Sequence, residues 1–170
     1  MRRLLKQTVL ILMAGAMSHA AQALDLNISG TVIASPCTVD TSSVSKDVDF
    51  GTVRSTDLKD AGSASDWKSF SVNLINCPVS TTKAQVTFTG NPAQEDATMY
   101  DNAGTASNVA VQMATYADKS NILGNGTSMT VNIDAQHQAT YLLAGRLVSI
   151  NGNTGPGTFN SVVQLNFTYQ

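Results

Sequence analysis

The chain has 170 residues, of which 42% are hydrophobic, enough for one domain with a packed core and too few for two comfortable ones. Charged residues make up only 13%, whereas 19 Thr, 17 Ser and 13 Asn together fill 49 positions, a mix that favours short strands and turns over amphipathic helices. A net charge of −2 argues against nucleic acid as a partner, because nucleic-acid binding needs clustered Lys and Arg.

The first 23 residues have the pattern of a secretory signal peptide. Arg2, Arg3 and Lys6 precede the apolar run 9–17, and the small-x-small sequence Ala21-Gln22-Ala23 follows. The run is too short to span a bilayer, and no later segment reaches that length. We therefore expect cleavage after Ala23 and a mature, exported chain that is not embedded in a membrane. A buried N-terminal helix is the alternative interpretation.

The segment 24–33, directly after the expected cleavage site, alternates between apolar or small residues and polar ones. Leu24, Leu26, Ile28, Gly30 and Val32 share one parity, and polar residues occupy the other. Such an extended segment suits addition as a strand to the sheet of another protein, with alternate side chains entering pockets. The pattern fits an ordinary first strand of the same domain equally well, so both interpretations stay open.

Two cysteines remain in the expected mature chain, Cys37 and Cys77. In an exported protein an even count predicts a disulfide, which here would close a loop of about 40 residues. A metal site would need more ligands than the single mature histidine, His137, can add, so we expect no metal and no cofactor. Two free buried thiols are the alternative.

From residue 72 onward, alternation with a period of two predicts a series of strands separated by Gly- and Asn-rich turns. The expected strands centre on Val72 and Leu74, Val86 and Phe88, Val109 to Met113, Val131 and Ile133, and Tyr141 and Leu143. This arrangement predicts an all-β sandwich, most simply a Greek key.

The clearest expected strand is the last one. Val163, Leu165, Phe167 and Tyr169 are apolar, and polar residues separate them up to Gln170. An open apolar edge at such a strand would promote aggregation unless something covers it, and the alternating segment 24–33 is a candidate cover.

Several motifs in this order and spacing resemble the chaperone–usher pilins of the type 1 fimbrial family. They are the signal peptide, the alternating extension, Pro36-Cys37-Thr38-Val39, Val48-Asp49-Phe50-Gly51, Asn76-Cys77-Pro78, Gly157 fourteen positions from the end, and the penultimate Tyr169. The resemblance covers essentially the whole chain. The chain length and the stretch 64–67 (Ala-Ser-Asp-Trp) look more like a minor tip-fibrillum subunit than the major rod subunit.

The resemblance implies an incomplete immunoglobulin-like sandwich that lacks its last strand, with residues 34–170 as the pilin domain. A periplasmic chaperone is expected to lend a strand beside Val163–Tyr169 and to hold the carboxylate of Gln170. At the outer-membrane usher, the extension of the next subunit would replace that strand. Residues 24–33 of this chain would fill a neighbour's groove in the same way, with Gly30 in a shallow pocket and Gly157 in the matching place of the groove.

Enzymatic chemistry finds little support in the sequence. His137 lies between two glutamines in a polar stretch, and no Gly-x-Ser-x-Gly motif is present, so a surface histidine is favoured over a catalytic one. Asp47 and Asp49 could flank a cation, but Lys46 beside them favours a solvated strand face. We therefore expect a structural subunit of an adhesive fimbria without catalytic activity. The alternatives are a self-complete exported module or adhesin that binds host carbohydrate and, remotely, a hydrolase.

Overall fold

A computed structural model describes residues 27–33 and 36–170 of the chain. The chain divides into two compact units, Met1–Thr31 and Val32–Gln170, and all the described secondary structure belongs to the second unit. The expected signal peptide and the first three residues of the expected extension lie outside the described residues.

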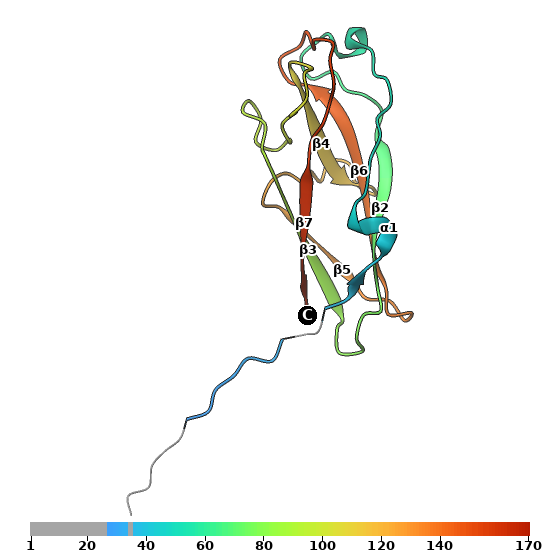
Figure 1. The fold of residues 1–170 in the computed structure, drawn as a ribbon, viewed down its shortest axis with the longest axis vertical. Coiled ribbons are helices and arrows are strands. Elements are labelled where there is room, and N and C mark those ends of the chain that lie inside the picture. Colours follow the sequence, from blue (N-terminus) through green and yellow to red (C-terminus); the bar gives the residue numbers. More distant parts are fainter. Residues whose placement is uncertain (1–26, 34–35) are drawn as a thin grey trace, which may run out of the picture. The chain divides into compact units, whose positions relative to one another are not determined.

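The second unit is built from two antiparallel sheets (Figure 1). The four-stranded sheet has the order β1-β2-β6-β4, with β1 at Thr38–Val39, β2 at Lys68–Ile75, β6 at Ala139–Ser149 and β4 at Val109–Thr115. The three-stranded sheet has the order β5-β3-β7, with β5 at Ser128–Asn132, β3 at Lys83–Gly90 and β7 at Val163–Tyr169. The all-β sandwich expected from the sequence is confirmed, as are all six strands expected from residue 72 onward.

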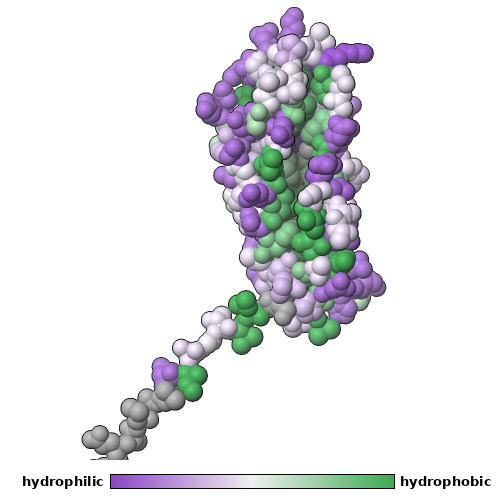
Figure 2. Space-filling view, viewed as in Figure 1, coloured by the Kyte–Doolittle hydropathy of each residue, from purple (hydrophilic) through white to green (hydrophobic). Residues whose placement is uncertain are grey.

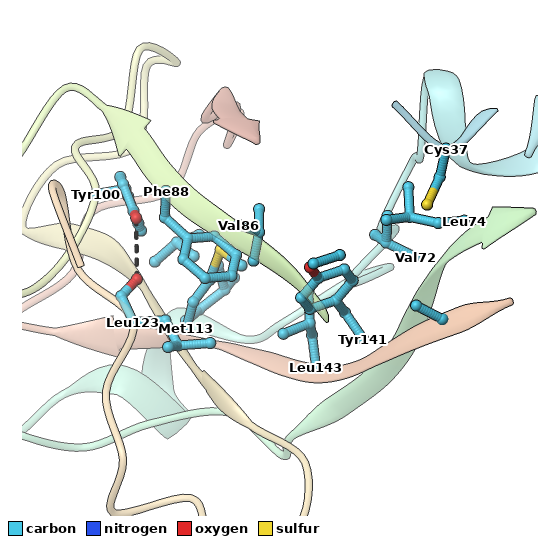
Figure 3. Close-up of a cluster of buried hydrophobic side chains, with 14 of the residues drawn as sticks. Cys37, Val72, Leu74, Val86, Phe88, Tyr100, Met113, Leu123, Tyr141 and Leu143 are labelled. Atoms are coloured by element: carbon cyan, nitrogen blue, oxygen red, sulfur yellow. Dashed lines mark hydrogen bonds between the residues drawn. The ribbon is translucent and has the colours of Figure 1, made fainter. Parts of the chain in front are cut away.

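The core lies between the two sheets, where alternate side chains of facing strands meet. Val86 and Phe88 on β3 are fully buried, as are Tyr141 and Leu143 on β6 (Figure 3). These are the apolar positions of the period-two pattern, because successive side chains of a strand point to opposite faces of the sheet.

Two buried tyrosines in this core differ in how their hydroxyls are satisfied. The Tyr100 hydroxyl donates to the carbonyl oxygen of Leu123 at 2.9 Å, and burial raises the pKa of Tyr100 to about 12 (Figure 3). Burial also raises the pKa of Tyr141 above its ordinary value, but its hydroxyl has no hydrogen-bond partner within the described part of the chain. Instead the Tyr141 ring packs on Phe167 of β7, with 5.7 Å between centroids.

Cys37 and Cys77 form the expected disulfide, which joins the start of β1 to the residues just after β2 across a sequence separation of 40. Between the two cysteines the chain forms two short helices that the sequence patterns did not predict, α1 at Thr41–Val44 and η1 at Ser55–Leu58. Asp40 caps α1 by accepting hydrogen bonds from the Ser42 hydroxyl and the Ser42 backbone N–H, and these bonds lower the pKa of its carboxyl. In the described residues no helix is long and apolar enough to cross a membrane.

Candidate functional site

β7 lies at the edge of its sheet and is paired on one side only. It runs antiparallel to β3, with Ala84 opposite Tyr169 and Gly90 opposite Val163. Gln170 and Lys83 exchange two backbone hydrogen bonds. In an antiparallel pair, the backbone groups of every second residue before Gln170 therefore also point toward β3. The backbone N–H and C=O groups of Val163, Leu165, Phe167 and Tyr169 therefore point away from β3. In the described residues these groups find no partner strand.

The side chains of the same four β7 residues point inward, yet none of them is fully covered. Each is half-buried, whereas the paired β3 residues Ala84, Val86 and Phe88 are 0% exposed. Two adjacent strands of one sheet thus differ sharply in burial. The difference indicates that the inward face of β7 borders an open space.

That space is a groove of about 790 Å³ between β7 and the chain after α1. Its floor consists of apolar side chains from the four-stranded sheet, namely Phe70, Val72, Val111 and Met113. Figure 2 shows apolar side chains gathered in a furrow between two more hydrophilic borders. Val44 and Val162, which are largely exposed, lie on the two borders of this groove.

The groove continues into a second cavity of about 540 Å³, lined among others by Val53, Leu58, Val109 and Leu147. Phe50 and Phe159 line both spaces and meet edge to face, with ring centroids 6.2 Å apart. This aromatic pair therefore stands where the two spaces join. The motif-based expectations named Phe50 only as part of a family motif and missed Phe159, because their meeting depends on long-range packing.

The border opposite β7 is the rim segment, residues 46–53. None of its backbone groups takes part in a backbone–backbone hydrogen bond to another described residue. It is held instead by side chains. The Lys68 ammonium donates to the carbonyl oxygen of Asp49 at 2.5 Å, and the Asp49 carboxylate accepts from the N–H of Gly51 at 2.7 Å. In the described residues, the backbone on both sides of the groove thus lacks a partner strand on the groove side.

The chain leading into β7 is fixed from its far side by the loop 102–106. Ala106 N–H donates to the Thr158 carbonyl at 3.0 Å, and Asn160 N–H donates to the Asn102 side chain at 2.9 Å. Gly157 lies in this contact and lines the second cavity; a Cβ there would stand 2.6 Å from the carbonyl carbon of Thr105. Close approach of the chain's own backbone is therefore one reason for glycine at position 157.

The remaining expected site residues fall at the two ends of the described chain. A main-chain carboxylate oxygen of Gln170 accepts hydrogen bonds from the N–H groups of Thr82 and Lys83 at 2.6 and 3.0 Å. In the expected extension, Ile28 is 83% exposed and Val32 100% exposed, and nothing lies within 4 Å of a Cβ built on Gly30. Leu24 and Leu26 lie outside the described residues.

The described residues contain no cluster of three or more His, Cys, Asp or Glu side chains that could hold a metal ion. His137 lies in the turn between β5 and β6 with a positive φ of 60°, and its backbone carbonyl accepts from Cys77 N–H at 2.9 Å. Asp47 and Asp49 are exposed on the rim segment. The one large apolar feature with open backbone edges in this part of the chain is the groove beside β7.

Comparison with known proteins shows the family of the chain. The family model of the fimbrial proteins matches residues 26–170. The chain belongs to the fimbrial protein family. It is similar to Protein FimG of Escherichia coli K12, with 35% identity over 161 residues, covering 94% of this chain and 92% of that protein. It is also 32% identical, over the full length of both chains, to the uncharacterized fimbrial-like protein YdeR of the same strain.

Solved structures agree on the fold of this fimbrial protein. The P pilus rod subunit PapA matches with a TM-score of 0.68 at 19% identity, covering 80% of this chain and all of that chain. A chaperone–usher pilus subunit matches with a TM-score of 0.66 at 20% identity, covering 88% and 97%. The protein is a chaperone–usher pilin with an immunoglobulin-like fold, a subunit of fimbriae that are exported through the periplasm to the cell surface. The resemblance inferred from the sequence motifs is confirmed.

Proposed function

We propose that this fimbrial subunit polymerises by donor-strand exchange and thereby contributes to an adhesive fimbria, with no catalytic role. The groove would accept an extended segment of the neighbouring subunit, and residues 24–33 of this chain would fill the groove of the next. The observation that carries the proposal is the free backbone edge of β7 beside an apolar groove. A self-complete module would leave that edge without purpose and exposed to aggregation.

The dimensions of the two parts match. At about 3.3 Å per residue, the nine residues from Leu24 to Val32 extend over about 30 Å. β7 itself, seven residues long, covers about 23 Å by the same measure, and the second cavity lengthens the groove beyond it. Burying four large apolar side chains of the extension would contribute roughly 6–12 kcal/mol before the cost of ordering the segment.

The same geometry supports the two expected assembly partners, a periplasmic chaperone and an outer-membrane usher. A groove with both borders unpaired needs a temporary cover in the periplasm, which a pilus chaperone would supply as a strand beside Val163–Tyr169. The outer-membrane usher would then exchange that strand for the neighbour's extension. Basic chaperone residues would hold one oxygen of the Gln170 carboxylate while the other oxygen stays bonded to the N–H groups of Thr82 and Lys83. We retain the interpretation as a minor tip subunit as a further prediction.

The decisive experiment compares two oxidised proteins made without any chaperone. One is residues 34–170 alone. The other, the self-complemented chain, carries residues 24–33 joined through a flexible linker after Gln170. We expect the first to aggregate or to melt at a very low temperature and the second to unfold cooperatively at a much higher one. An ordinary melting transition for the bare domain would overturn the proposal.

The matched control is Gly30→Arg in the appended segment. In donor-strand exchange this residue faces a shallow pocket, so an arginine side chain should abolish the rescue. Thr31→Arg, whose side chain has the opposite parity, should leave the rescue intact. If both variants rescue equally, the appended segment does not bind as a strand in the expected register.

A further inference from the structure

The outer face of the four-stranded sheet carries a guanidinium held from two sides. Gln112 on β4 lies opposite Arg146 on β6 in the strand register. The Arg146 Nε donates to the Gln112 side-chain oxygen at 2.9 Å, and the guanidinium carbon lies 4.5 Å from the centre of the Trp67 ring. Gln112 is itself 9% exposed, so its amide offers a fixed anchor.

A β-bulge brings Trp67 to this position. The register of β2 against β6 pairs Lys68 with Gly145, while the isolated bridge before it pairs Ala64 with Val148. The four residue steps from Ala64 to Lys68 thus face only three steps from Gly145 to Val148. One extra residue therefore lies between Ala64 and Lys68. Ser65 secures the bulge through two hydrogen bonds with Leu147, of 2.9 and 3.0 Å. Such bulges re-aim side chains, here the Trp67 ring against Arg146.

The held guanidinium keeps unused hydrogen-bond donors. Its Nε–H is occupied by Gln112, but the two terminal nitrogens carry four more N–H groups. The described residues form no ion pair with Arg146, whose partners are Gln112 and Trp67. Planar, fixed and half-exposed, these donors match a carboxylate in a bidentate arrangement.

A second cation–aromatic pair lies farther along the same face. Tyr116 follows β4, and its N–H donates to the Leu142 carbonyl at 3.0 Å, so Tyr116 lies opposite Leu142. Lys119 Nζ stands 4.7 Å from the centre of the Tyr116 ring and donates to the Tyr116 carbonyl oxygen at 2.8 Å. Leu142 precedes Arg146 by four residues, which is about 13 Å along the strand. Tyr116 and Leu142 are 47% and 50% exposed.

Small side chains separate the two pairs. Ala144 on β6 has Ser69 of β2 on one side and Ala114 of β4 on the other. Ser69 is exposed, whereas both alanines are fully buried. This face, called the strip below, therefore has an aromatic ring and a cation at each end, and the alanines between the two ends are covered. It lies opposite the groove, because Gln112 alternates with Val111 and Met113, whose side chains form the groove floor. A donor strand and a ligand on this strip would not compete.

We propose that this strip binds an acidic oligosaccharide, with Arg146 taking the carboxylate of a uronic acid or similar sugar and Tyr116 supporting a second sugar ring. Arg146 and Lys119, which form no ion pair within the described part of the chain, supply the charge complementarity. A peptide is disfavoured because β6, paired with β2 and β4, offers no free edge for a strand. The two ends, about 13 Å apart, require an oligosaccharide rather than a single sugar.

The test is calorimetric titration of the full chain, purified from the periplasm together with its assembly partner. The probes are a galacturonate trisaccharide and its methyl ester, which has the same shape without the charge. We expect the acid to bind and the ester to bind at least about tenfold more weakly, because hydrogen bonds to a charged group are lost. Absence of binding by the acid would overturn the proposal.

Variants locate the binding. Gln112→Glu keeps the shape of the side chain but gives Arg146 a carboxylate partner within the protein. The affinity for the acidic trisaccharide should therefore fall at least about tenfold. Arg146→Met should have the same effect, while Arg54→Met removes the same charge from an exposed loop position and should change affinity less than about twofold. Unchanged affinity in Gln112→Glu would refute the assignment. The assignment would also be refuted if a tetraglutamate peptide displaced the trisaccharide and bound with the same affinity as the trisaccharide.

Discussion

The two buried tyrosines occupy similar places in the core, but only one hydroxyl has a partner. Removing the Tyr100 hydroxyl leaves the Leu123 carbonyl oxygen buried and unpaired, whereas removing the Tyr141 hydroxyl leaves nothing behind. Tyr100→Phe should therefore lower the free energy of unfolding of the self-complemented chain by about 1–3 kcal/mol. Tyr141→Phe should leave it unchanged or raise it slightly, because burying an unpaired hydroxyl is unfavourable. Denaturant titration measures both, and an equal loss in the two variants would contradict the argument.

At the scale of elements, β7 has two faces with opposite tasks. Leu165 and Gln164 both border the groove, but Leu165 is half-buried and points into it, whereas the exposed Gln164 side chain points to the opposite face because side chains alternate along a strand. Leu165→Glu should weaken capture of a donor strand by about 3–5 kcal/mol, because the charge would be buried without a partner. Gln164→Glu adds the same carboxylate one residue away and should be tolerated. The yield of chaperone-bound subunit in the periplasm reports capture; equal yields would argue against a donor strand packed on the inward face of β7.

At the scale of the whole molecule, the disulfide closes the loop that contains α1, η1 and the rim segment. This loop borders the groove and has few backbone hydrogen bonds to hold it. The conformational entropy that it would gain on unfolding without the disulfide should therefore strongly affect the free energy of unfolding. Replacing both cysteines by serine in the self-complemented chain should cost about 4 kcal/mol for a closed loop of this length. The same denaturant titration measures the loss. A change of less than about 1 kcal/mol would mean that packing alone holds the loop.

The regular parts of the fold were predictable from the sequence, because their signals are local. The alternation in Val163–Tyr169 and the buried residues of β3 and β6 follow a period of two that any half-buried strand imposes. The cysteine pair followed from the expected export of the chain. Each of these inferences needs only the residues themselves and the face on which they fall.

The parts that the sequence did not predict depend on contacts between distant segments. The Phe50–Phe159 pair joins residues 109 positions apart, and nothing local to either phenylalanine indicates the other. Likewise, the close approach of Thr105 to Gly157 arises only once the loop 102–106 packs against the chain before β7. The bulge at Trp67 depends on the register against β6, which a single strand pattern cannot specify.

The disulfide also determines how tension would travel through a fibre of such subunits. The proposed extension enters the domain at Cys37, and the covalent bond passes directly to Cys77, next to the end of β2. A pulling force that enters at Cys37 would therefore cross into the four-stranded sheet without stretching the loop between the two cysteines. In a reduced subunit the 40-residue loop could pay out roughly 135 Å of chain at about 3.4 Å per residue, and one groove border would be lost with it. The disulfide thus keeps the groove that would hold one neighbour's extension intact while the other neighbour pulls on this chain's own extension.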